Sequence, residues 1–258
     1  MAEQTVAITL AGEYVNRRGD RIEIRDEISE AVTETVLHLP TEELACAGAE
    51  FSPVVEVTDE STLLAAIRLA PDAACLVFAS ARNPGGGFLS GASAQEETLA
   101  RSSALYACQQ AAREFYVHHR ADHDLRYSDR VIYSPGVPVF RDDDGVLLDG
   151  PYRVAFLTAA APNLGAILAN QSELAATVPE VIRRRAVRVL EVAAAHGHRT
   201  VVLGAWGCGV FKNDPSVVAA AFEHAIQAVR RFDRIVIAAY DAVRPFAYLA
   251  TDAAQSPR

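Results

Sequence analysis

The 258-residue chain lacks several features that mark special classes of protein. No stretch approaches the roughly 20 consecutive apolar residues that span a bilayer. The N-terminus has no basic segment followed by an apolar run of the length found in a secretion signal. The four cysteines stand far apart, at Cys46, Cys75, Cys108 and Cys208, without the paired spacing of a zinc site or a disulfide framework. We therefore expect a cytoplasmic protein with reduced, mostly buried thiols.

An excess of positive charge is also missing. The formal net charge is −9, which argues against general binding to nucleic acid or to an anionic membrane. Half of the residues are hydrophobic, as in ordinary globular proteins, and a chain of this length buries a substantial core without disulfides or metals. A single anionic ligand is still compatible with this charge, because backbone N–H groups can make one pocket locally positive.

Strand-like and helix-like segments alternate along most of the chain. Short apolar runs predict buried strands at residues 74–79, 131–133, 154–158, 200–203 and 234–239. Helical patterns predict helices at residues 96–118, 180–195 and 215–231. This order predicts an α/β domain whose largely parallel sheet is covered on both faces. Residues 1–60 fit less well, and we expect them to form an N-terminal extension packed on a single domain spanning residues 1–258.

Two glycine-rich loops follow predicted strands. The first contains Gly-Gly-Gly at residues 85–87 and leads to Gln-Glu-Glu at residues 95–97, where a helix begins. The second, residues 204–213, joins a strand to a helix, so its N–H groups and the helix dipole suit a diphosphate. It has neither the Gly-Lys-Ser/Thr of a P-loop nor the glycine spacing of a Rossmann fingerprint. Because ligands of open α/β sheets bind beyond the carboxyl ends of strands, both loops are expected at one site.

The first loop with its Gln-Glu-Glu resembles the catalytic signature of poly(ADP-ribose) glycohydrolases, in the shorter form found in bacteria. The second loop resembles the diphosphate loop of macrodomains, so the resemblance covers about residues 70–240. It implies a macrodomain-like three-layer α/β/α fold with a mixed, largely parallel central sheet and a cleft for ADP-ribose. It also implies hydrolysis of the ribose–ribose O-glycosidic bonds of poly(ADP-ribose), acting from chain ends, with release of ADP-ribose and without a metal or organic cofactor.

The resemblance assigns roles to individual residues. Glu97 would be the catalytic acid and base, and Glu96 would hold hydroxyls of the ribose at the scissile bond. The substrate would also contact Asn83, Gly85, Gly86, Gly87, Gln95, Gly207, Cys208, Gly209, Val210 and Phe211. Cys208 is expected to contribute its backbone amide rather than its thiol. The tyrosine-bearing element that covers the adenine in animal enzymes of this class is not evident in the sequence.

The chemistry of bond cleavage agrees with a pair of carboxyls. Cleaving the glycosidic bond passes through an oxocarbenium-like state, which requires protonation of the leaving oxygen. Burial beside a like charge would raise the pKa of the acid, so that it keeps its proton near neutral pH. Carboxyls adjacent in sequence need not face each other across a bond. One is therefore expected to transfer the proton and the other to position the ribose.

Two other functions would use the same site. One is removal of single ADP-ribose groups from protein or nucleic acid, and the other is binding of ADP-ribose without catalysis, against which the intact Glu96 and Glu97 argue. Purely structural interpretations also exist, since carboxylates favour helix N-termini and glycines favour tight connections. We expect a monomer whose partners are poly(ADP-ribose) or ADP-ribosylated macromolecules.

Other conspicuous side chains are expected to be structural. The histidines at 118, 119 and 123 lack a Glu-x-x-His pattern or a cysteine partner, so a solvated helix end is predicted rather than a metal site. Asp-Asp-Asp-Gly at residues 142–145 predicts a turn rather than a calcium loop. The arginines at 183–185 predict a solvated helix, with docking of a long polymeric anion as the alternative. Trp206 is expected to pack beneath its loop.

Overall fold

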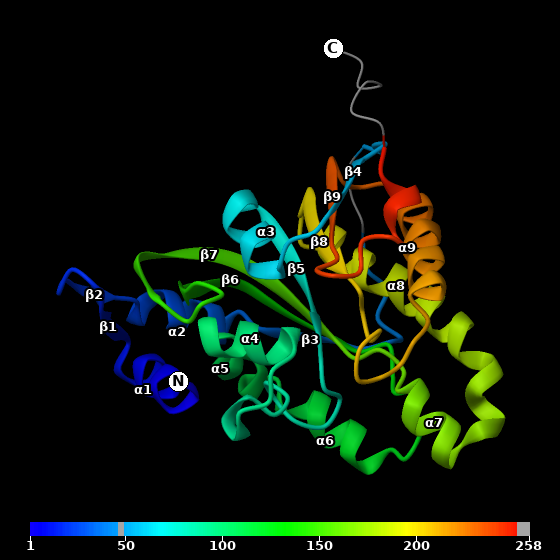
Figure 1. Cartoon of the computed structure of the whole chain (residues 1–258), viewed down its shortest axis with the longest axis horizontal. Coiled ribbons are helices and arrows are strands. Elements are labelled where there is room, and N and C mark those ends of the chain that lie inside the picture. The colour runs from blue at the N-terminus through cyan, green and yellow to red at the C-terminus, as the bar shows by residue number, and fades with distance from the viewer. Residues whose placement is uncertain (46–48, 252–258) are drawn as a thin grey trace.

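A seven-stranded sheet lies between two layers of helices in the computed structural model, which describes residues 1–45 and 49–251 (Figure 1). The strands are β1 Glu13–Val15, β2 Arg21–Glu23, β3 Val36–His38, β4 Val54–Thr58, β5 Ala73–Phe78, β6 Val131–Arg141, β7 Leu147–Ala159, β8 Thr200–Gly204 and β9 Arg234–Ala238. The helices are α1 Ala2–Ala11, α2 Arg25–Thr33, α3 Thr62–Leu69, α4 Gln95–Ser102, α5 Leu105–Ala111, α6 Arg113–Ala121, α7 Leu164–Asn170, α8 Val178–Ala195 and α9 Pro215–Ala228. Within the described ranges, no helix combines the length and the apolar character that a bilayer span requires.

The strand order is β3-β6-β7-β5-β8-β9-β4. The strands from β7 to β4 run parallel, β6 is antiparallel to β7, and β3 is antiparallel to β6. The prediction of a mixed, largely parallel sheet is therefore confirmed. Its central strands β5, β8 and β9 are the continuous apolar runs of the sequence, as befits strands covered on both faces.

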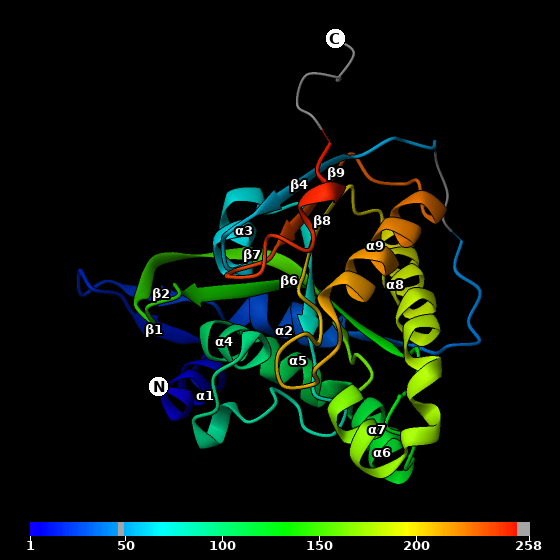
Figure 2. The ribbon, with the colours of Figure 1, turned by 45° about the vertical axis from the view of Figure 1, so that its right-hand side comes forward.

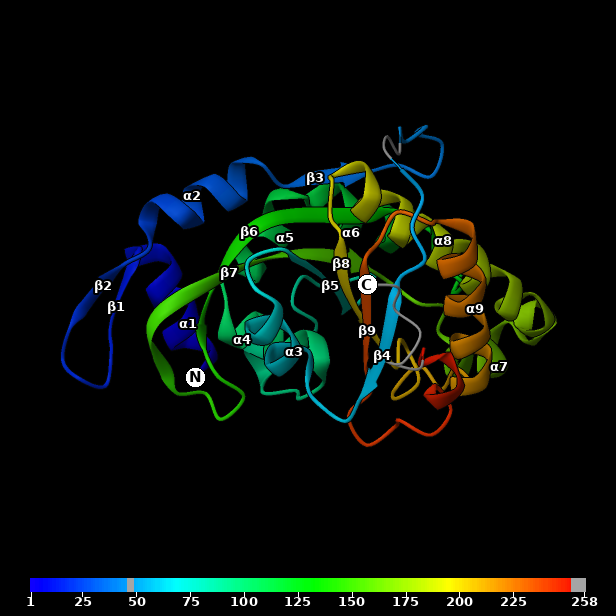
Figure 3. The same ribbon diagram turned by 90° about the horizontal axis from the view of Figure 1, so that it is seen from above.

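Successive residues of the central strands face different helical layers, because side chains alternate along a strand. Leu76 and Leu203 belong to the core shared with α8 and α9, whereas Cys75 and Val202 belong to the core shared with α3 and α5. Figures 2 and 3 show α8 and α9 side by side on one side of the sheet. The expected three-layer α/β/α arrangement is confirmed. Cys75 and Cys108 are buried free thiols and Cys208 is half-buried, while Cys46 lies outside the described residues.

Residues 1–60 do not all form an extension of the sheet domain. Strand β3 pairs with β6 and β4 pairs with β9, so these two segments are the edges of the central sheet. An N-terminal extension of the sheet domain therefore ends before β3, not near residue 60. Organisation as a single domain stays a prediction.

The prediction of one long helix over residues 96–118 is wrong, because the three shorter helices α4, α5 and α6 occupy this range. Ser103 accounts for the first break. Its hydroxyl donates to the Leu99 carbonyl at 2.7 Å and accepts the Leu105 N–H at 3.2 Å. A serine hydroxyl that bonds to a preceding carbonyl and to a following N–H competes with the backbone hydrogen bonds of the helix. After the break, α5 buries Gln109 completely.

The remaining elements follow the predictions with changed lengths. The short strands expected near residues 131–133 and 154–158 are ends of the long β6–β7 hairpin, and residues 142–145 form its turn. Asp142 stabilises this turn by accepting the N–H of Val146 at 2.8 Å. Helix α9 ends at Ala228, before the expected residue 231.

Arg185 is not solvated, so the prediction for residues 183–185 is wrong at this position. It is 0% exposed, and its Nε donates to Asp129 Oδ1 at 2.8 Å. Its remaining guanidinium nitrogens donate to the carbonyl oxygens of Arg126 (2.9 Å), Ala160 (2.6 Å) and Tyr127 (3.1 Å). Arg185 therefore ties the loop before β6 to the chain just after β7.

Replacing Arg185 by Met should lower the free energy of unfolding by about 3–5 kcal/mol, because three carbonyl groups lose their donor inside the protein and Asp129 is left with Arg184 alone. Arg183→Met, on the exposed side of the same helix, is the matched control and should have little effect. Urea denaturation of both variants checks this. Equal, small losses would show that the buried guanidinium is not a structural tie.

Candidate active site

Glu96 and Glu97 lie in the first turn of α4, beyond the carboxyl end of β5. Glu96 is only 3% exposed. Its Oε2 accepts the Ser80 N–H at 2.6 Å, and its Oε1 accepts Nε2–H of Gln109 at 3.0 Å. Burial raises the pKa of Glu96 to about 8, the charge of Glu97 adds to this, and the two hydrogen bonds oppose it. The raised pKa is thus found at Glu96, whereas the sequence predicted it for Glu97; the role of Glu97 as catalytic acid stays a prediction.

Glu97 is the more accessible of the two carboxyls. Its Oε1 accepts the N–H of Gly87 at 3.0 Å. No partner is found for its Oε2 among residues 1–45 and 49–251. One oxygen is therefore anchored to the glycine loop and the other is available to a substrate.

The N–H groups of the glycine loop bond to acceptors of the protein itself and do not point into an empty cradle. All three N–H groups of residues 85–87 donate within the protein. The acceptors are, in chain order, Gln109 Oε1 at 2.7 Å, the Asn83 carbonyl at 3.0 Å and Glu97 Oε1 at 3.0 Å. This loop therefore offers a ligand its surface and its shape rather than free donors.

Gly86 lies between the two carboxyls. Its φ of 58° is in the left-handed region. A Cβ on Gly86 would collide with Oε1 of Glu97 and would lie 3.0 Å from Oε2 of Glu96. Only glycine lets the backbone pass this close to both groups.

Gln95, predicted to bind substrate, is engaged on both sides of its amide. Its Oε1 accepts the Phe78 N–H at 2.9 Å, and its Nε2 donates to the Leu76 carbonyl at 2.7 Å and to Thr62 Oγ1 at 3.1 Å. It thus clamps the start of α4 to the end of β5. Contact with substrate stays a prediction for Gln95, as it does for the exposed Asn83.

The second loop presents free donors. No acceptor is found among the described residues for the N–H groups of Gly209, Val210 and Phe211. Val210 is 81% exposed, so these groups lie at the surface just before α9. Consecutive free N–H groups near a helix N-terminus form an anion site. The Cys208 N–H, expected to take part, instead donates to the Ala205 carbonyl at 3.1 Å.

The base of the second loop is packed tightly. Gly207 has a φ of 71°, and a Cβ there would lie 2.5 Å from Nδ2 of Asn213. That Nδ2 donates to the Pro162 carbonyl at 2.9 Å. Trp206 is buried as predicted, and its Nε1 donates to the Ala159 carbonyl at 3.1 Å. The loop is therefore fixed to the chain that follows β7.

A cavity of about 640 Å³ lies beside the start of α4 and the ends of β8 and β9. Gln95 and Thr98 of α4 line it together with Ala205, which follows β8. Tyr240, 69% exposed, lines it from the end of β9. Its volume is typical of a site for a nucleotide-sized molecule.

The sequence interpretation missed Ser80 and Gln109. Ser80 follows a predicted strand directly, so its position at the strand end was a usable signal. Nothing in the sequence separates Gln109 from its neighbour Gln110, because the difference is burial.

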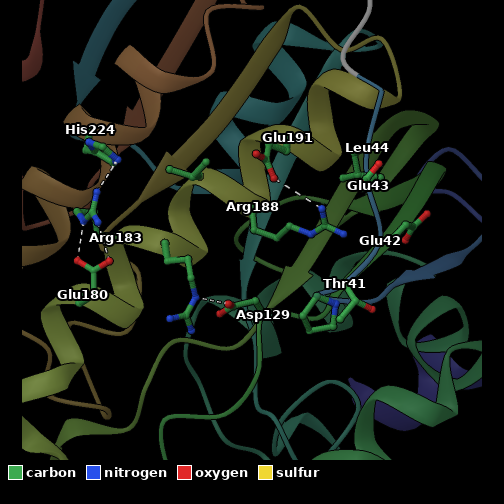
Figure 4. Close-up of a pocket in the computed structure, with 13 residues that line it drawn as sticks. Thr41, Glu42, Glu43, Leu44, Asp129, Glu180, Arg183, Arg188, Glu191 and His224 are labelled. Carbon is green, nitrogen blue, oxygen red and sulfur yellow. Dashed lines mark hydrogen bonds and ion pairs between the residues drawn. The ribbon is translucent and has the colours of Figure 1, made fainter.

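The histidines and arginines named from the sequence do not enlarge this site. No group of three or more metal-binding side chains occurs among the described residues. His119 is buried, not solvated, and its Nε2 lies 2.7 Å from Ser128 Oγ. Arg183 and Arg184 line a separate cavity of about 560 Å³, where Glu180 and Asp129 bind them (Figure 4). Its charged lining is Glu42, Glu43, Asp129, Glu180 and Glu191 against Arg183, Arg184 and Arg188, so docking of a polyanion there is not supported.

The pKa of Glu96 predicts how stability depends on pH. The unfolded chain ionises this group near 4.5 and the folded protein only near 8, so the folded protein binds the extra proton between these values. The contribution of Glu96 to the free energy of unfolding should therefore fall as pH rises from 6.5 to 8.5. Burial also lowers the pKa of His118, His119, His196 and His198, and their opposite effect fades as pH rises above the ordinary histidine value of 6.5.

Urea denaturation at several pH values across this window measures the slope. Glu96→Gln should remove the fall in the free energy of unfolding that Glu96 contributes across this window. A change in stability that is the same at every pH would not affect this result. An unchanged slope in Glu96→Gln would assign the proton to another group.

Comparison with known proteins identifies the family. The family described as "Microbial-type PARG, catalytic domain" matches residues 2–142. The crystal structure of poly(ADP-ribose) glycohydrolase (PARG) from Thermomonospora curvata is 46% identical, with a TM-score of 0.88, over 96% of this chain and 97% of that chain. The same enzyme bound to the inhibitor ADP-HPD is 47% identical with a TM-score of 0.86, over 96% of this chain and 97% of that chain.

A further relative is the Deinococcus radiodurans poly(ADP-ribose) glycohydrolase in complex with ADP-ribose. It is 41% identical, with a TM-score of 0.81, over 86% of this chain and 96% of that chain. A comparison with curated proteins gave no match. The predicted resemblance and the macrodomain-like fold are confirmed. The chain belongs to the microbial-type poly(ADP-ribose) glycohydrolase family.

Proposed function

We propose that this protein hydrolyses the ribose–ribose O-glycosidic bonds of poly(ADP-ribose) and releases ADP-ribose. The observation that carries the proposal is the carboxyl pair at Gly86, where a Cβ would collide with Oε1 of Glu97 and lie 3.0 Å from Oε2 of Glu96, and where burial raises the pKa of Glu96. Family membership supports it, as does the D. radiodurans relative in complex with ADP-ribose.

The loops suggest how ADP-ribose lies. Its diphosphate accepts hydrogen bonds from the free N–H groups of residues 209–211. Its terminal ribose lies against residues 85–87, with its hydroxyls toward Glu96. Its adenosine half then enters the cavity beside Gln95, where the ring of Tyr240 is exposed. Asn83 and Phe211 contact the terminal ribose from the two loops.

In the proposed mechanism Glu97 transfers the proton. Ribose hydroxyls donate to Glu96 and stabilise its ionised form, so the proton that the pair holds moves to Glu97. Glu97 gives it to the bridging oxygen through the free Oε2 as the bond from that oxygen to the anomeric carbon breaks. The ionised Glu97 then takes a proton from the water that attacks the anomeric carbon.

The test is incubation of the purified protein with poly(ADP-ribose) of defined length, alongside protein and nucleic acid that carry single ADP-ribose groups. We expect free ADP-ribose from the polymer, with products shortening one unit at a time from a chain end. Release only from the singly modified substrates would make it a mono-ADP-ribosyl hydrolase. Binding of ADP-ribose without any turnover would make it a reader. Action as a monomer and a cytoplasmic location remain predictions.

A further inference from the structure

One buried amide joins the carboxyl pair to the glycine loop. The side chain of Gln109, 0% exposed on α5, donates from Nε2 to Glu96 Oε1 at 3.0 Å and accepts the Gly85 N–H on its Oε1 at 2.7 Å. We propose that Gln109 is a positioning residue that fixes the Glu96 carboxyl and the glycine loop relative to each other. This inference rests on the proposed function, since Gln109 would act on the reaction only through those two groups.

An amide is the side chain that this position requires. The Gly85 N–H needs an acceptor, and the Glu96 carboxylate needs a donor. An amide supplies both, whereas a carboxylate offers only acceptors and a thioether only a weak acceptor. A longer contact of 3.4 Å from Nε2 to Thr158 Oγ1 adds strand β7 to the same junction.

The donor also matters for the charge of Glu96. Burial and the Glu97 carboxyl favour its neutral form, and the bonds from Ser80 and Gln109 favour its ionised form. Burial and then the charge of Glu96 raise the pKa of the Tyr116 hydroxyl, which has no hydrogen-bond partner among the described residues. Loss of the Gln109 donor should therefore move the ionisation of Glu96 to higher pH.

Two substitutions separate the two bonds of Gln109, and a third is the control. Gln109→Met removes both bonds and should lower kcat for ADP-ribose release by about 10- to 100-fold, because the catalytic groups lose their fixed geometry. Gln109→Glu keeps an acceptor for the Gly85 N–H but places a charge beside Glu96. Gln110→Met changes an exposed neighbour, whose Nε2 only reaches the Tyr106 hydroxyl at 3.0 Å, and should resemble the wild type.

The discriminating measurement is the pH profile of kcat/KM on poly(ADP-ribose), together with calorimetric affinity for ADP-ribose. In both Gln109 variants, the part of the pH profile that is set by ionisation of the carboxyl pair should move to higher pH. This shift should be larger in Gln109→Glu than in Gln109→Met. ADP-ribose affinity should stay closer to wild type in Gln109→Glu, because the loop bond remains. Activity that falls while this part of the profile stays in place, or a profile equal to that of Gln110→Met, would overturn the proposal.

A readout without turnover keeps this test independent of the proposed function. The ionisation of Glu96 also appears in the pH dependence of urea unfolding between pH 6.5 and 8.5. If the wild-type chain releases no ADP-ribose, the proposed function fails. An upward shift of that window in the Gln109 variants would still support the positioning role, and an unchanged window would refute it.

Discussion

Glu97→Gln is expected to lower kcat for ADP-ribose release by about 10²- to 10⁴-fold, the usual contribution of a general acid–base group. The amide can still accept the Gly87 N–H through its Oε1, so the loop should keep its shape. It cannot give a proton to the bridging oxygen or accept one from water. Single-turnover release of ADP-ribose from poly(ADP-ribose) measures the loss.

The same variant should bind ADP-ribose with nearly unchanged affinity, because in the proposed mechanism Glu96 and the two loops hold the ribose. Glu114→Gln, an exposed acid on α6, serves as a control for loss of charge and should retain full activity. Turnover that survives Glu97→Gln would remove the proton-transfer role from this residue. Loss of affinity together with turnover would give Glu97 the ribose-holding role instead.

Gly86→Ala is expected to lower kcat by about 100-fold or more, since displacing catalytic groups by about 1 Å costs this much. The new methyl group would overlap the Glu97 carboxyl and press on that of Glu96, and neither carboxyl can retreat without breaking its hydrogen bonds. The variant should also melt at lower temperature because φ is 58° at this position.

Gly91→Ala separates these two effects. Gly91 has a φ of 86°, but a Cβ there meets no heavy atom within 4 Å. It should therefore lose stability like Gly86→Ala and keep its activity. If both variants lose activity equally, the left-handed backbone rather than contact with the carboxyls explains the glycine.

The sequence predicted those parts of the fold that depend on local pattern. Strands β5, β8 and β9 are short, continuous apolar runs, and each lies within a residue of its predicted bounds. Helix α8 has a regular apolar face and was found as readily. The break at Ser103 was not predicted, because a serine in a helical pattern interrupts it only when its hydroxyl binds the backbone on both sides.

Strand β6 shows a second limit. Its prolines and Gly136 resemble loop signals, and the register shifts between Ser134 and Val137 let the strand continue past them. Pairing with β7, rather than local preference, keeps this segment extended.

The candidate site was predicted where its residues are contiguous in sequence. The two glycine loops and the carboxyl pair could be named, but the burial that distinguishes Glu96 from Glu97 depends on Ser80 and Gln109 from other elements. Likewise, Arg185 differs from Arg183 only in the side of α8 that it occupies. Distances between elements, which no sequence pattern contains, decide these roles.

A crystal structure of this protein with ADP-ribose bound tests the central claim most directly. We expect the terminal ribose between Gly86 and the carboxyl pair, with Oε2 of Glu97 nearest the anomeric oxygen and the diphosphate on the N–H groups of residues 209–211. ADP-ribose bound with its terminal ribose turned away from Glu97, or with its diphosphate outside the second loop, would contradict the account.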